Sequence, residues 1–329
     1  MNRVETVRGP VATADLGMTL MHEHIVNITG ELARDYPHLS WPGGQDAVLE
    51  TVVARLREVR ERGIRTIVDA SAFGHGRDPE FLRRVNERVD INVVCATGYY
   101  TYAEVPFFFK FRQPRPGKWD VLVEMFVGDI REGIAGTGIR AAVIKCATDE
   151  AGVTPEIERI LRACAVAHRE TGAPITTHTR SDLRNGLDQL DVFASEGVDP
   201  GRVIVGHSGD TQDLDYLREL MDRGATIGAD RFGLNERMGF PSFEQRLETV
   251  AALCELGYAD RIVLSHDVTL HTDWLDPEAP AWDMPPEWLQ THISDFVLPA
   301  LRERGVPEDQ IELMMVGNPR RVFESAEPY

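Results

Sequence analysis

Eight short apolar runs, rich in β-branched residues, recur along the chain and constrain its fold more than any other feature. Several are apolar almost without interruption, as in "TIVDA", "AAVIKCA" and "RVIVGH", which is typical of parallel strands buried on both faces. Segments with helical periodicity separate them. The predicted strands are Met18–His22, Arg65–Ala70, Asn92–Thr97, Arg140–Cys146, Pro174–His178, Arg202–His207, Ala225–Ala229 and Arg261–Ser265.

The segments between these strands predict helices, among them Asp46–Arg62, Pro155–Glu170, Leu214–Arg223 and Phe243–Leu256. The second has a recognisable start and stop. Thr154 suits the N-cap, Pro155 the first helical position and Gly172 the residue after the last turn. Alternation of strand and helix repeated eight times indicates a (β/α)8 TIM barrel that forms a single domain over residues 1–329. A doubly wound open sheet is the alternative, although it usually has fewer strands.

The charge and cysteine content argue against several classes of protein. With a formal net charge of −18, the chain lacks the concentrated Lys and Arg that bind nucleic acid or anionic membranes. Its four cysteines are widely spaced, which argues against a disulfide framework and suits a reducing compartment. The N-terminus lacks a secretory pattern, and no apolar segment is long enough to span a bilayer. We therefore expect a cytoplasmic protein.

Two predicted connections are too long to be simple turns. Gly98–Lys118 follows the third strand and is rich in Tyr and Phe, and Val268–Pro286 follows the eighth and contains Trp274 and Trp282. In a barrel both would overhang the carboxyl ends of the strands, where substrates bind. For the stretch "PFFFKF", a dimer interface or packing against the helices explains the aromatic residues equally well.

The stretch "LMHEHIV" places His22 and His24 two residues apart on a predicted strand, so both project to the same face. Glu23 points the other way and is expected to anchor a nearby polar group. An HxH pair alone is weak support for a metal site. Three more candidates stand at or just past strand ends and would meet at the same mouth of the barrel: His178, His207 and Asp267. Together they match the ligand preferences of zinc and similar divalent metals.

Lys145 closes the fourth predicted strand, in "AVIKCA". An ammonium group that faces a barrel core, or lies beside divalent cations, is unfavourable unless its charge changes. One interpretation is a buried acid that neutralises the lysine. The other is conversion of the amine to a carbamate by carbon dioxide, which would bridge two metals with two oxygens. The residues alone leave both interpretations open.

The chain resembles the phosphotriesterase family of the amidohydrolase superfamily in seven ordered segments: "GMTLMHEH", "IKCATDE", "THTRSDLRNGLDQL", "VIVGHSGD", "GADRFG", "VLSHD" and "GNPRRVF". The resemblance runs from about Arg8 to Phe323 and implies a hydrolase with two divalent metal ions. It implies that one ion is held by His22, His24 and Asp267, and the other by His178 and His207. Carboxylated Lys145 and a hydroxide would bridge them. Ligand type favours zinc or iron, and cobalt or manganese also fit.

Within this family the chain is most similar to the phosphotriesterase-like lactonases. Tyr100 matches their tyrosine after the third strand, Arg231 their arginine after the seventh, and Trp274 their tryptophan in the eighth loop. The resemblance implies that Tyr100 stabilises an oxyanion, Arg231 orients Tyr100 or the substrate, and Trp274 lines a channel for an acyl tail. Tyr99 competes with Tyr100, since strand alternation lets only one face the site. A salt bridge with Asp230 or a loop acid is the alternative role for Arg231.

The expected activity is hydrolysis of lactones, either N-acyl homoserine lactones, with quorum quenching as the consequence, or γ- and δ-lactones. Weak organophosphate triesterase activity and a homodimer are also expected. Asp267 would take the nucleophile's proton and pass it to the leaving alkoxide. The alternatives are a dedicated phosphotriesterase (aryldialkylphosphatase), another cyclic amide or ester hydrolase, and a non-catalytic binding barrel. The last predicts a broken ligand set, whereas all six candidate ligands are present.

Overall fold

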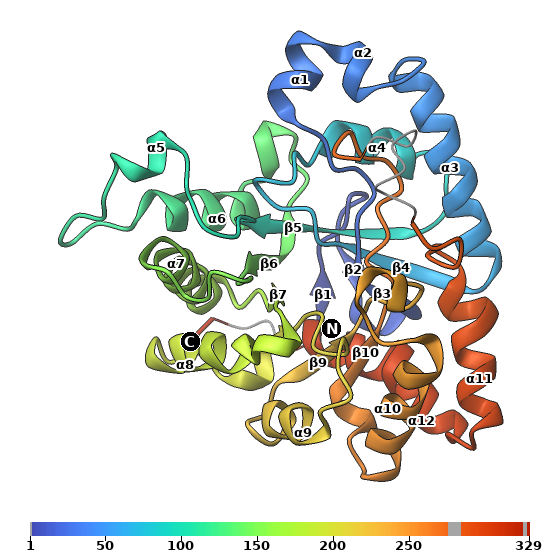
Figure 1. Ribbon diagram of the computed structural model, residues 1–329. Helices are drawn as coiled ribbons and strands as arrows, with labels where there is room; N and C mark the ends of the chain where they lie inside the picture. Colours follow the sequence, from blue (N-terminus) through green and yellow to red (C-terminus); the bar gives the residue numbers. More distant parts are fainter. Residues whose placement is uncertain (1, 276–283, 325–327) are drawn as a thin grey trace.

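The computed structural model describes residues 2–275, 284–324 and 328–329 (Figure 1). At its centre is an eight-stranded parallel sheet whose neighbours in space are neighbours in the chain. Its strands are β3 Met18–Glu23, β4 Ile64–Asp69, β5 Asn92–Gly98, β6 Ala141–Ala147, β7 Ile175–His178, β8 Val203–Val205, β9 Thr226–Ala229 and β10 Ile262–Leu264. Each predicted strand is confirmed, with ends that differ by at most two residues.

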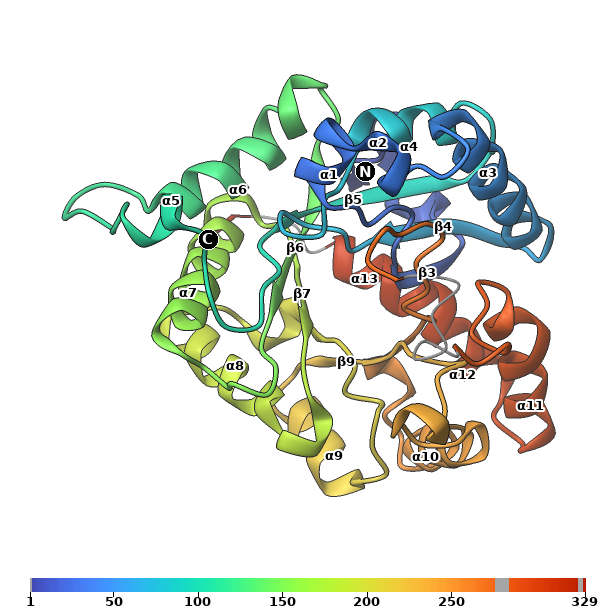
Figure 2. The ribbon, with the colours of Figure 1, turned by 45° about the horizontal axis from the view of Figure 1, so that its top comes forward.

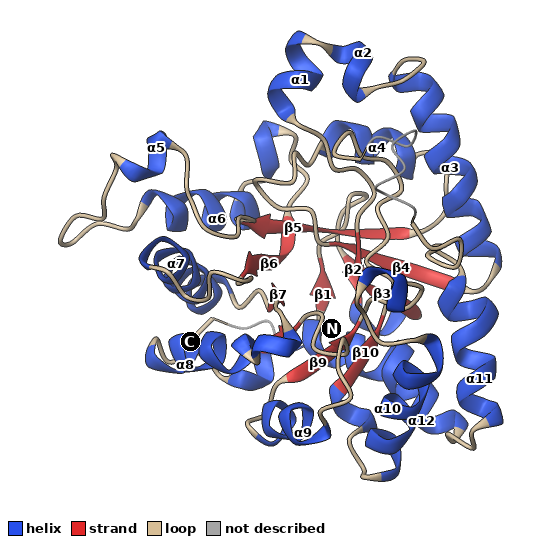
Figure 3. Ribbon diagram, in the orientation of Figure 1, coloured by secondary structure: helices blue, strands red, loops and turns tan. Residues whose placement is uncertain are grey.

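The first and last strands of the sheet meet and close it into a barrel. Just beyond β3 and β10, His24 and Thr269 form a parallel bridge. The His24 N–H donates to Val268 O at 3.0 Å, and the Leu270 N–H donates to His24 O at 2.9 Å. The helices form a ring outside the strands (Figures 2 and 3). The predicted (β/α)8 TIM barrel is therefore confirmed.

The helices occupy the segments between the strands and the segment after β10. The α-helices are α1 Gly30–Asp35, α2 Pro37–Ser40, α3 Gln45–Glu61, α4 Pro79–Asn86, α5 Phe107–Lys110, α6 Val121–Arg131, α7 Pro155–Thr171, α8 Asn185–Ser195, α9 Leu214–Asp222, α10 Phe243–Glu255, α11 Leu298–Glu303, α12 Glu308–Glu312 and α13 Asn318–Glu324. Short π-helical turns, Ile293–Val297 and Leu313–Gly317, lead into α11 and α13. Short 3₁₀ turns are Thr13–Asp15, Ile134–Gly136, Ser181–Leu183, Pro200–Arg202, Glu236–Met238 and Ala259–Arg261.

The ends of α7 confirm the predicted helix signals. The Thr154 side chain accepts a hydrogen bond from the Ile157 N–H, and Gly172 follows the last turn in the left-handed conformation, with φ 77°. An antiparallel pair that the sequence patterns did not predict, β1 Arg3–Val4 and β2 Val11–Ala12, precedes the barrel. These strands are two residues long, too short to produce a periodic signal.

Two apolar clusters lie on the two sides of the barrel wall. The larger packs the outward residues of the strands, such as Ile67 and Val93, against the helices. The smaller fills the interior with the inward residues, such as Val68 and Val94, and with Phe323 of α13. Since α13 contacts β10, β1 and the first 3₁₀ turn, it plugs the amino-terminal end of the barrel. The predicted ligands lie at the opposite, carboxyl-terminal end of the strands.

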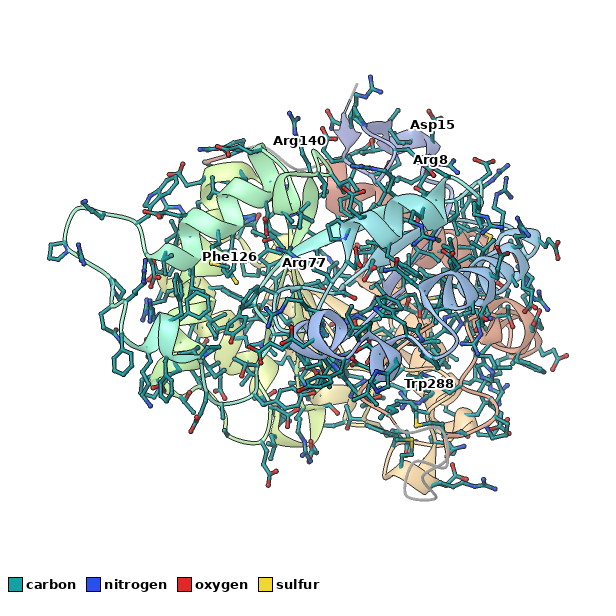
Figure 4. The ribbon with its side chains drawn as sticks, turned by 90° about the horizontal axis from the view of Figure 1, so that it is seen from above. Arg8, Asp15, Arg77, Phe126, Arg140 and Trp288 are labelled. Atoms are coloured by element: carbon teal, nitrogen blue, oxygen red, sulfur yellow. The ribbon has the colours of Figure 1, made fainter. Side chains whose placement is uncertain are left out.

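A view from above separates these two ends (Figure 4). Arg8, Asp15 and Arg140, which precede strands, lie along one edge of the view, and Trp288 lies on the opposite side.

All four cysteines are free and buried. No helix in the described ranges combines the length and the apolar character needed to cross a membrane.

Candidate active site

The predicted ligands converge at the carboxyl ends of the strands: His22 and His24 at the end of β3, Lys145 in β6, His178 in β7, His207 after β8 and Asp267 after β10. Asp267 lies at the centre of the group. Its Oδ1 is 3.2 Å from His24 Nε2 and 3.6 Å from His22 Nε2. Its Oδ2 is 3.7 Å from His207 Nε2. The rings of His178 and His207 have centroids 4.7 Å apart.

The hydrogen bonds of His24 fix which of its nitrogens carries the proton. The Ser71 hydroxyl donates to Asn27 Oδ1 at 2.8 Å, so its oxygen accepts from His24 Nδ1 at 2.9 Å. His24 Nε2 then has a free lone pair, which faces the Asp267 carboxylate at 3.2 Å. A ring nitrogen and a carboxylate oxygen at this distance can share one cation, or one proton when no cation is bound. The arrangement fits a metal ion.

Asp230, after β9, orients two of the histidines at once. Its Oδ1 accepts from the His207 backbone N–H and from His207 Nδ1, both at 2.9 Å. Its Oδ2 lies 3.1 Å from His22 Nδ1, although without hydrogen-bond alignment. Burial alone would raise the pKa of Asp230, but the neighbouring His207 and His22 hold it well below its usual value. The hydrogen bond places the proton of His207 on Nδ1, and the negative charge 3.1 Å from His22 Nδ1 favours a proton there as well, which leaves both Nε2 atoms available to a metal.

Asp149 plays the same part for His178. Its Oδ2 lies 2.6 Å from His178 Nε2, which places the proton there and leaves Nδ1 as the nitrogen able to bind a cation. Burial lowers the pKa of His178 to about 4, so the ring is neutral at physiological pH. Burial likewise lowers the pKa values of His22 and His207. Neutral imidazole is the form that ligates metals.

Lys145 is fully enclosed at the base of this group. Its Nζ lies 2.6 Å from His22 Nε2 and donates to Thr177 O at 3.3 Å. Burial lowers the pKa of the amine to about 8. Among the described residues, no salt bridge pairs Lys145 with an acid. The amine therefore reaches its neutral, nucleophilic form at a pH not far above neutrality.

The hydrogen bonds of Glu23 show what the acidic residue between the two histidines does. Its Oε1 accepts from the Ser265 hydroxyl at 2.8 Å and from the His266 N–H and Nδ1 at 2.9 and 2.6 Å. Its Oε2 accepts from the Val268 N–H at 3.0 Å. It points away from the histidine ligands, as strand alternation predicts, and clamps the turn that carries Asp267.

Two of the candidate ligands have strained backbones. Asp267 has φ 58° and His207 has φ 61°, in the left-handed region that residues other than Gly rarely adopt. Such residues persist only where the surroundings enforce them, and they concentrate at functional sites. The Glu23 clamp enforces the conformation at Asp267, and the two hydrogen bonds that His207 donates to Asp230 enforce it at His207.

The donor set as a whole fits divalent metal ions. Ligand atoms of His22, His24 and Asp267 lie within 4.8 Å of one another, and those of His22, His207 and Asp230 form a second such group. Two of the predicted ligands lie outside both groups: Lys145, and His178, whose Nε2 is turned to Asp149. Neutral histidines, carboxylates and free lone pairs suit zinc and its first-row neighbours.

Arg231 pairs with Asp267, not with Asp230. Its Nε donates to Asp267 Oδ2 at 2.9 Å, and its Nη1 donates to Asp210 Oδ2 at 3.2 Å. Asp210 also accepts from Arg246 Nη1 at 2.6 Å. Burial alone would raise the pKa of Asp267, but His207 and Arg231 hold it well below its usual value. Arg231 thus keeps Asp267 ionised and fixes the orientation of its carboxylate.

A cavity of about 240 Å³ opens above the histidines. Tyr100 lines it, whereas Tyr99 is turned into the apolar core against Phe73 and Phe109. The Tyr100 hydroxyl forms a short hydrogen bond with that of Tyr102, whose ring lies 5.0 Å from His178. Burial raises the pKa of Tyr100 well above 10, so its hydroxyl stays protonated.

The other wall of the cavity is apolar. Trp274 lies at the rim, half-exposed, and Trp288 lies deeper, where its Nε1–H donates to His266 O at 2.8 Å. The apolar lining comes from the loops after β9 and β10: Leu234, Met238, Phe240, Leu275 and Met284. Trp282, predicted to lie in the eighth loop, falls outside the described residues.

Sequence reasoning missed four residues of this site: Asp149, Asp230, Tyr102 and His75. His75 is buried in the cavity wall, with its ring centroid 4.8 Å from that of His24 and 3.8 Å from that of Tyr100. A signal for it existed. His75 stands between two glycines in "FGHGRD", in the loop that follows β4, and such loops form the mouth of a barrel.

Comparison with known proteins agrees with this site. The sequence profile of the phosphotriesterase family matches residues 2–323. The aryldialkylphosphatase of Saccharolobus solfataricus is 36% identical over 315 residues, which cover 95% of this chain and 96% of that protein.

Two solved structures are also similar over nearly their whole length. A phosphotriesterase from Mycobacterium tuberculosis has 47% identity and a TM-score of 0.93, covering 99% of this chain and 100% of that one. A second structure comes from engineering of organophosphate hydrolysis activity from a weak promiscuous lactonase template. It has 40% identity and a TM-score of 0.88, covering 98% of this chain and 100% of that one.

Proposed function

The chain belongs to the phosphotriesterase family and is a hydrolase that acts on ester bonds; on that premise we propose that its main substrates are lactones. Hydrolysis of organophosphate triesters is then a weak side activity. The observation that carries this proposal is the Tyr100–Tyr102 pair above the histidines. In such a pair one hydroxyl proton joins the two oxygens, and the other is free to donate to a substrate oxygen.

The metal centre of the proposal uses the residues already described. His22, His24 and Asp267 would hold one divalent ion, and His178 and His207 the other. Zinc or iron fits the ligand types best, and cobalt or manganese is compatible with them. When bound, such ions supply a nucleophile from water at neutral pH and act as a Lewis acid on the carbonyl.

Lys145 would bridge the two ions as a carbamate. The neutral amine would attack carbon dioxide, so that an N–C bond forms while one C–O π bond opens and leaves its electron pair on oxygen, and one amine proton is lost to water. The product is an anion with two oxygens, which removes the problem of an ammonium group beside cations. The buried position of Lys145 and its pKa of about 8 support this step.

The remaining residues act on the substrate. Tyr100 donates a hydrogen bond to the oxygen on which charge develops as the lactone carbonyl is attacked. Asp267, held ionised by Arg231, takes a proton from the nucleophile and delivers it to the leaving alkoxide. Trp274 and the apolar wall accommodate one acyl tail. A single apolar wall suits one tail better than the three substituents of a phosphotriester.

A substrate comparison tests the lactonase proposal. The native chain is assayed with a long-chain N-acyl homoserine lactone, an alkyl δ-lactone and paraoxon, beside a Tyr100→Phe variant. We expect kcat/KM for at least one lactone to far exceed that for paraoxon. Tyr100→Phe should lower kcat for the lactone by about 100- to 1,000-fold, the usual cost of one lost oxyanion donor.

The same assay can contradict the proposal. A kcat/KM for paraoxon above that of both lactones would instead make the chain a dedicated phosphotriesterase. Turnover of N-acyl homoserine lactones would carry quorum quenching as its consequence. We also propose a cytoplasmic location, since the four free, buried cysteines suit a reducing compartment.

We further propose that the chain forms a homodimer through the aromatic segment 107–118, which projects from the barrel beside α6 (Figure 1). Phe107 and Phe111 are 72% and 78% exposed, an arrangement typical of interaction surfaces. This segment contains four basic residues and no acid, in a chain of net charge −18, so it suits the acidic surface of a second copy. Light scattering should report a dimer that becomes a monomer in a Phe107→Asp, Phe111→Asp variant. A monomeric native chain would contradict this.

A further inference from the structure

We propose that His75 is a substrate-binding residue whose Nε2–H donates a hydrogen bond to an amide carbonyl next to the lactone ring. This inference rests on the proposed lactonase activity and narrows its substrate class. It predicts a preference for lactones that carry an acylamino substituent over lactones that carry only an alkyl chain.

Two glycines allow the backbone around His75 to approach neighbouring segments closely. Gly74 and Gly76 have φ 100° and 72°, and a Cβ there would lie 2.3 Å from Tyr100 O and 1.5 Å from Ile28 O respectively. The His75 N–H donates to Ala72 O at 3.1 Å, and His75 O accepts from the Ile28 N–H at 3.0 Å. The residue is therefore held in one place before any substrate binds.

One hydrogen bond fixes the tautomer of the His75 ring. The Ala72 backbone N–H donates to His75 Nδ1 at 3.1 Å, so Nδ1 is an acceptor and carries no proton. The proton of the neutral ring then lies on Nε2. Within the described ranges the hydrogen bond of the His75 ring is the one at Nδ1, and the ring lines the cavity. Burial lowers the pKa of His75 well below 6.5, which agrees with a neutral ring.

The position of the ring places this donor beside the reacting group. His75 lies between His24, with centroids 4.8 Å apart, and Tyr100, with centroids 3.8 Å apart. Its plane is within 10° of the plane of Trp274, 5.7 Å away at the rim. A lactone carbonyl at the metal ligands brings the atoms adjacent to its ring to the level of His75. An acylamino lactone carries an amide there, whereas an alkyl lactone carries only hydrogen and carbon.

Asn27 and Thr272, two other polar side chains on this wall, each have a hydrogen-bond partner in the protein. Asn27 Oδ1 accepts from Ser71, and Thr272 Oγ1 accepts from the Trp274 N–H at 3.0 Å. An alkyl substrate that covers His75 leaves its N–H buried without a partner, and an amide carbonyl satisfies it. A site that holds such a donor discriminates against the ligand that lacks the acceptor.

Two variants at His75 separate the donor from the ring. His75→Phe keeps a planar ring beside Tyr100 and removes the N–H, and His75→Gln restores an amide N–H. With an N-acyl homoserine lactone, His75→Phe should raise KM by about 10- to 100-fold, the effect of one lost hydrogen bond to a buried donor, with kcat within about twofold. His75→Gln should recover most of this loss. With an alkyl γ-lactone of matched chain length KM should not rise and should fall, because the variant no longer buries an unpaired N–H against the alkyl chain.

A binding measurement makes the test independent of turnover. Titration calorimetry with an N-acylamino lactam, which resists hydrolysis, should show weaker binding to His75→Phe than to the native chain at equal metal content. An unsubstituted alkyl lactam should bind His75→Phe at least as tightly as it binds the native chain, because it accepts no hydrogen bond from His75. Equal losses for both lactams, or no loss for either, would overturn the assignment to His75. Lactam binding that depends on His75 in a chain without lactone turnover would overturn the proposed function alone.

Discussion

Replacing Asp230 by asparagine is expected to lower the affinity of the site for divalent metal ions by about 10- to 100-fold, the usual cost of losing the partner of a histidine ligand. The reason is that one carboxylate serves two histidines. Its oxygens face the Nδ1 atoms of His207 and His22 at 2.9 and 3.1 Å.

The asparagine variant cannot serve both rings. Its carbonyl oxygen accepts from one Nδ1–H, but its NH₂ group faces the other Nδ1 and forces that nitrogen to become an acceptor. The proton of that ring then moves to Nε2, the atom that faces Asp267, and blocks its lone pair. Because asparagine has the same size as aspartate, the expected loss of metal affinity comes from the changed position of the proton on the histidine ring.

The measurement is a competition titration of Asp230→Asn against a metal-binding dye, with circular dichroism to confirm the fold. Asp149→Asn is the matched control because Asp149 contacts only His178 among the ligands. We expect Asp149→Asn to lower the binding affinity for one metal ion and Asp230→Asn to lower the affinity for both. Native affinity in Asp230→Asn would contradict the orienting role of this carboxylate.

The barrel and the ligand candidates were predictable because both depend on local periodicity. Apolar runs with a period suited to buried parallel strands located all eight strands of the sheet. Once the strands were located, their carboxyl ends located His178, His207 and Asp267 at one mouth. The period-two alternation of a strand also predicted that Glu23 points away from His22 and His24. The four hydrogen bonds of Glu23 agree with this prediction.

The partners of the ligands were not predictable from such patterns. Asp230 precedes Arg231 in the sequence, and adjacency suggested an ion pair, whereas the two side chains turn to different neighbours. The left-handed backbones of His207 and Asp267 follow from tertiary hydrogen bonds, so no residue preference announces them. His75 enters the cavity only because two glycines let its loop approach Ile28 and Tyr100.

Which of Tyr99 and Tyr100 faces the cavity could likewise not be predicted from the sequence pattern alone. Alternation indicates that one of them faces the cavity, but which one depends on where β5 ends. The strand ends at Gly98, and the Tyr100 N–H then donates to Phe73 O at 2.8 Å. This contact joins Tyr100 to the loop after β4 and turns its ring toward His75.

Replacing Lys145 by alanine is expected to have the largest effect of any single change. The proposed carbamate would contribute a ligand to both ions, so its removal should weaken both at once and leave little hydrolysis of any substrate. Three lysines occur in the chain, Lys110, Lys118 and Lys145, and of these only Lys145 is buried. Lys118→Ala therefore serves as the control for loss of an exposed amine.

The most direct test of the account is the metal content of the native chain and of these two variants, measured with ¹³C-labelled carbon dioxide present. We predict about two equivalents of divalent metal per chain and a ¹³C carbamate signal in the native chain and in Lys118→Ala. Lys145→Ala should lack the signal and retain less than about one equivalent of metal. Full metal content in Lys145→Ala, or a native chain without the carbamate signal, would contradict the bridged two-metal centre on which the proposed hydrolysis depends.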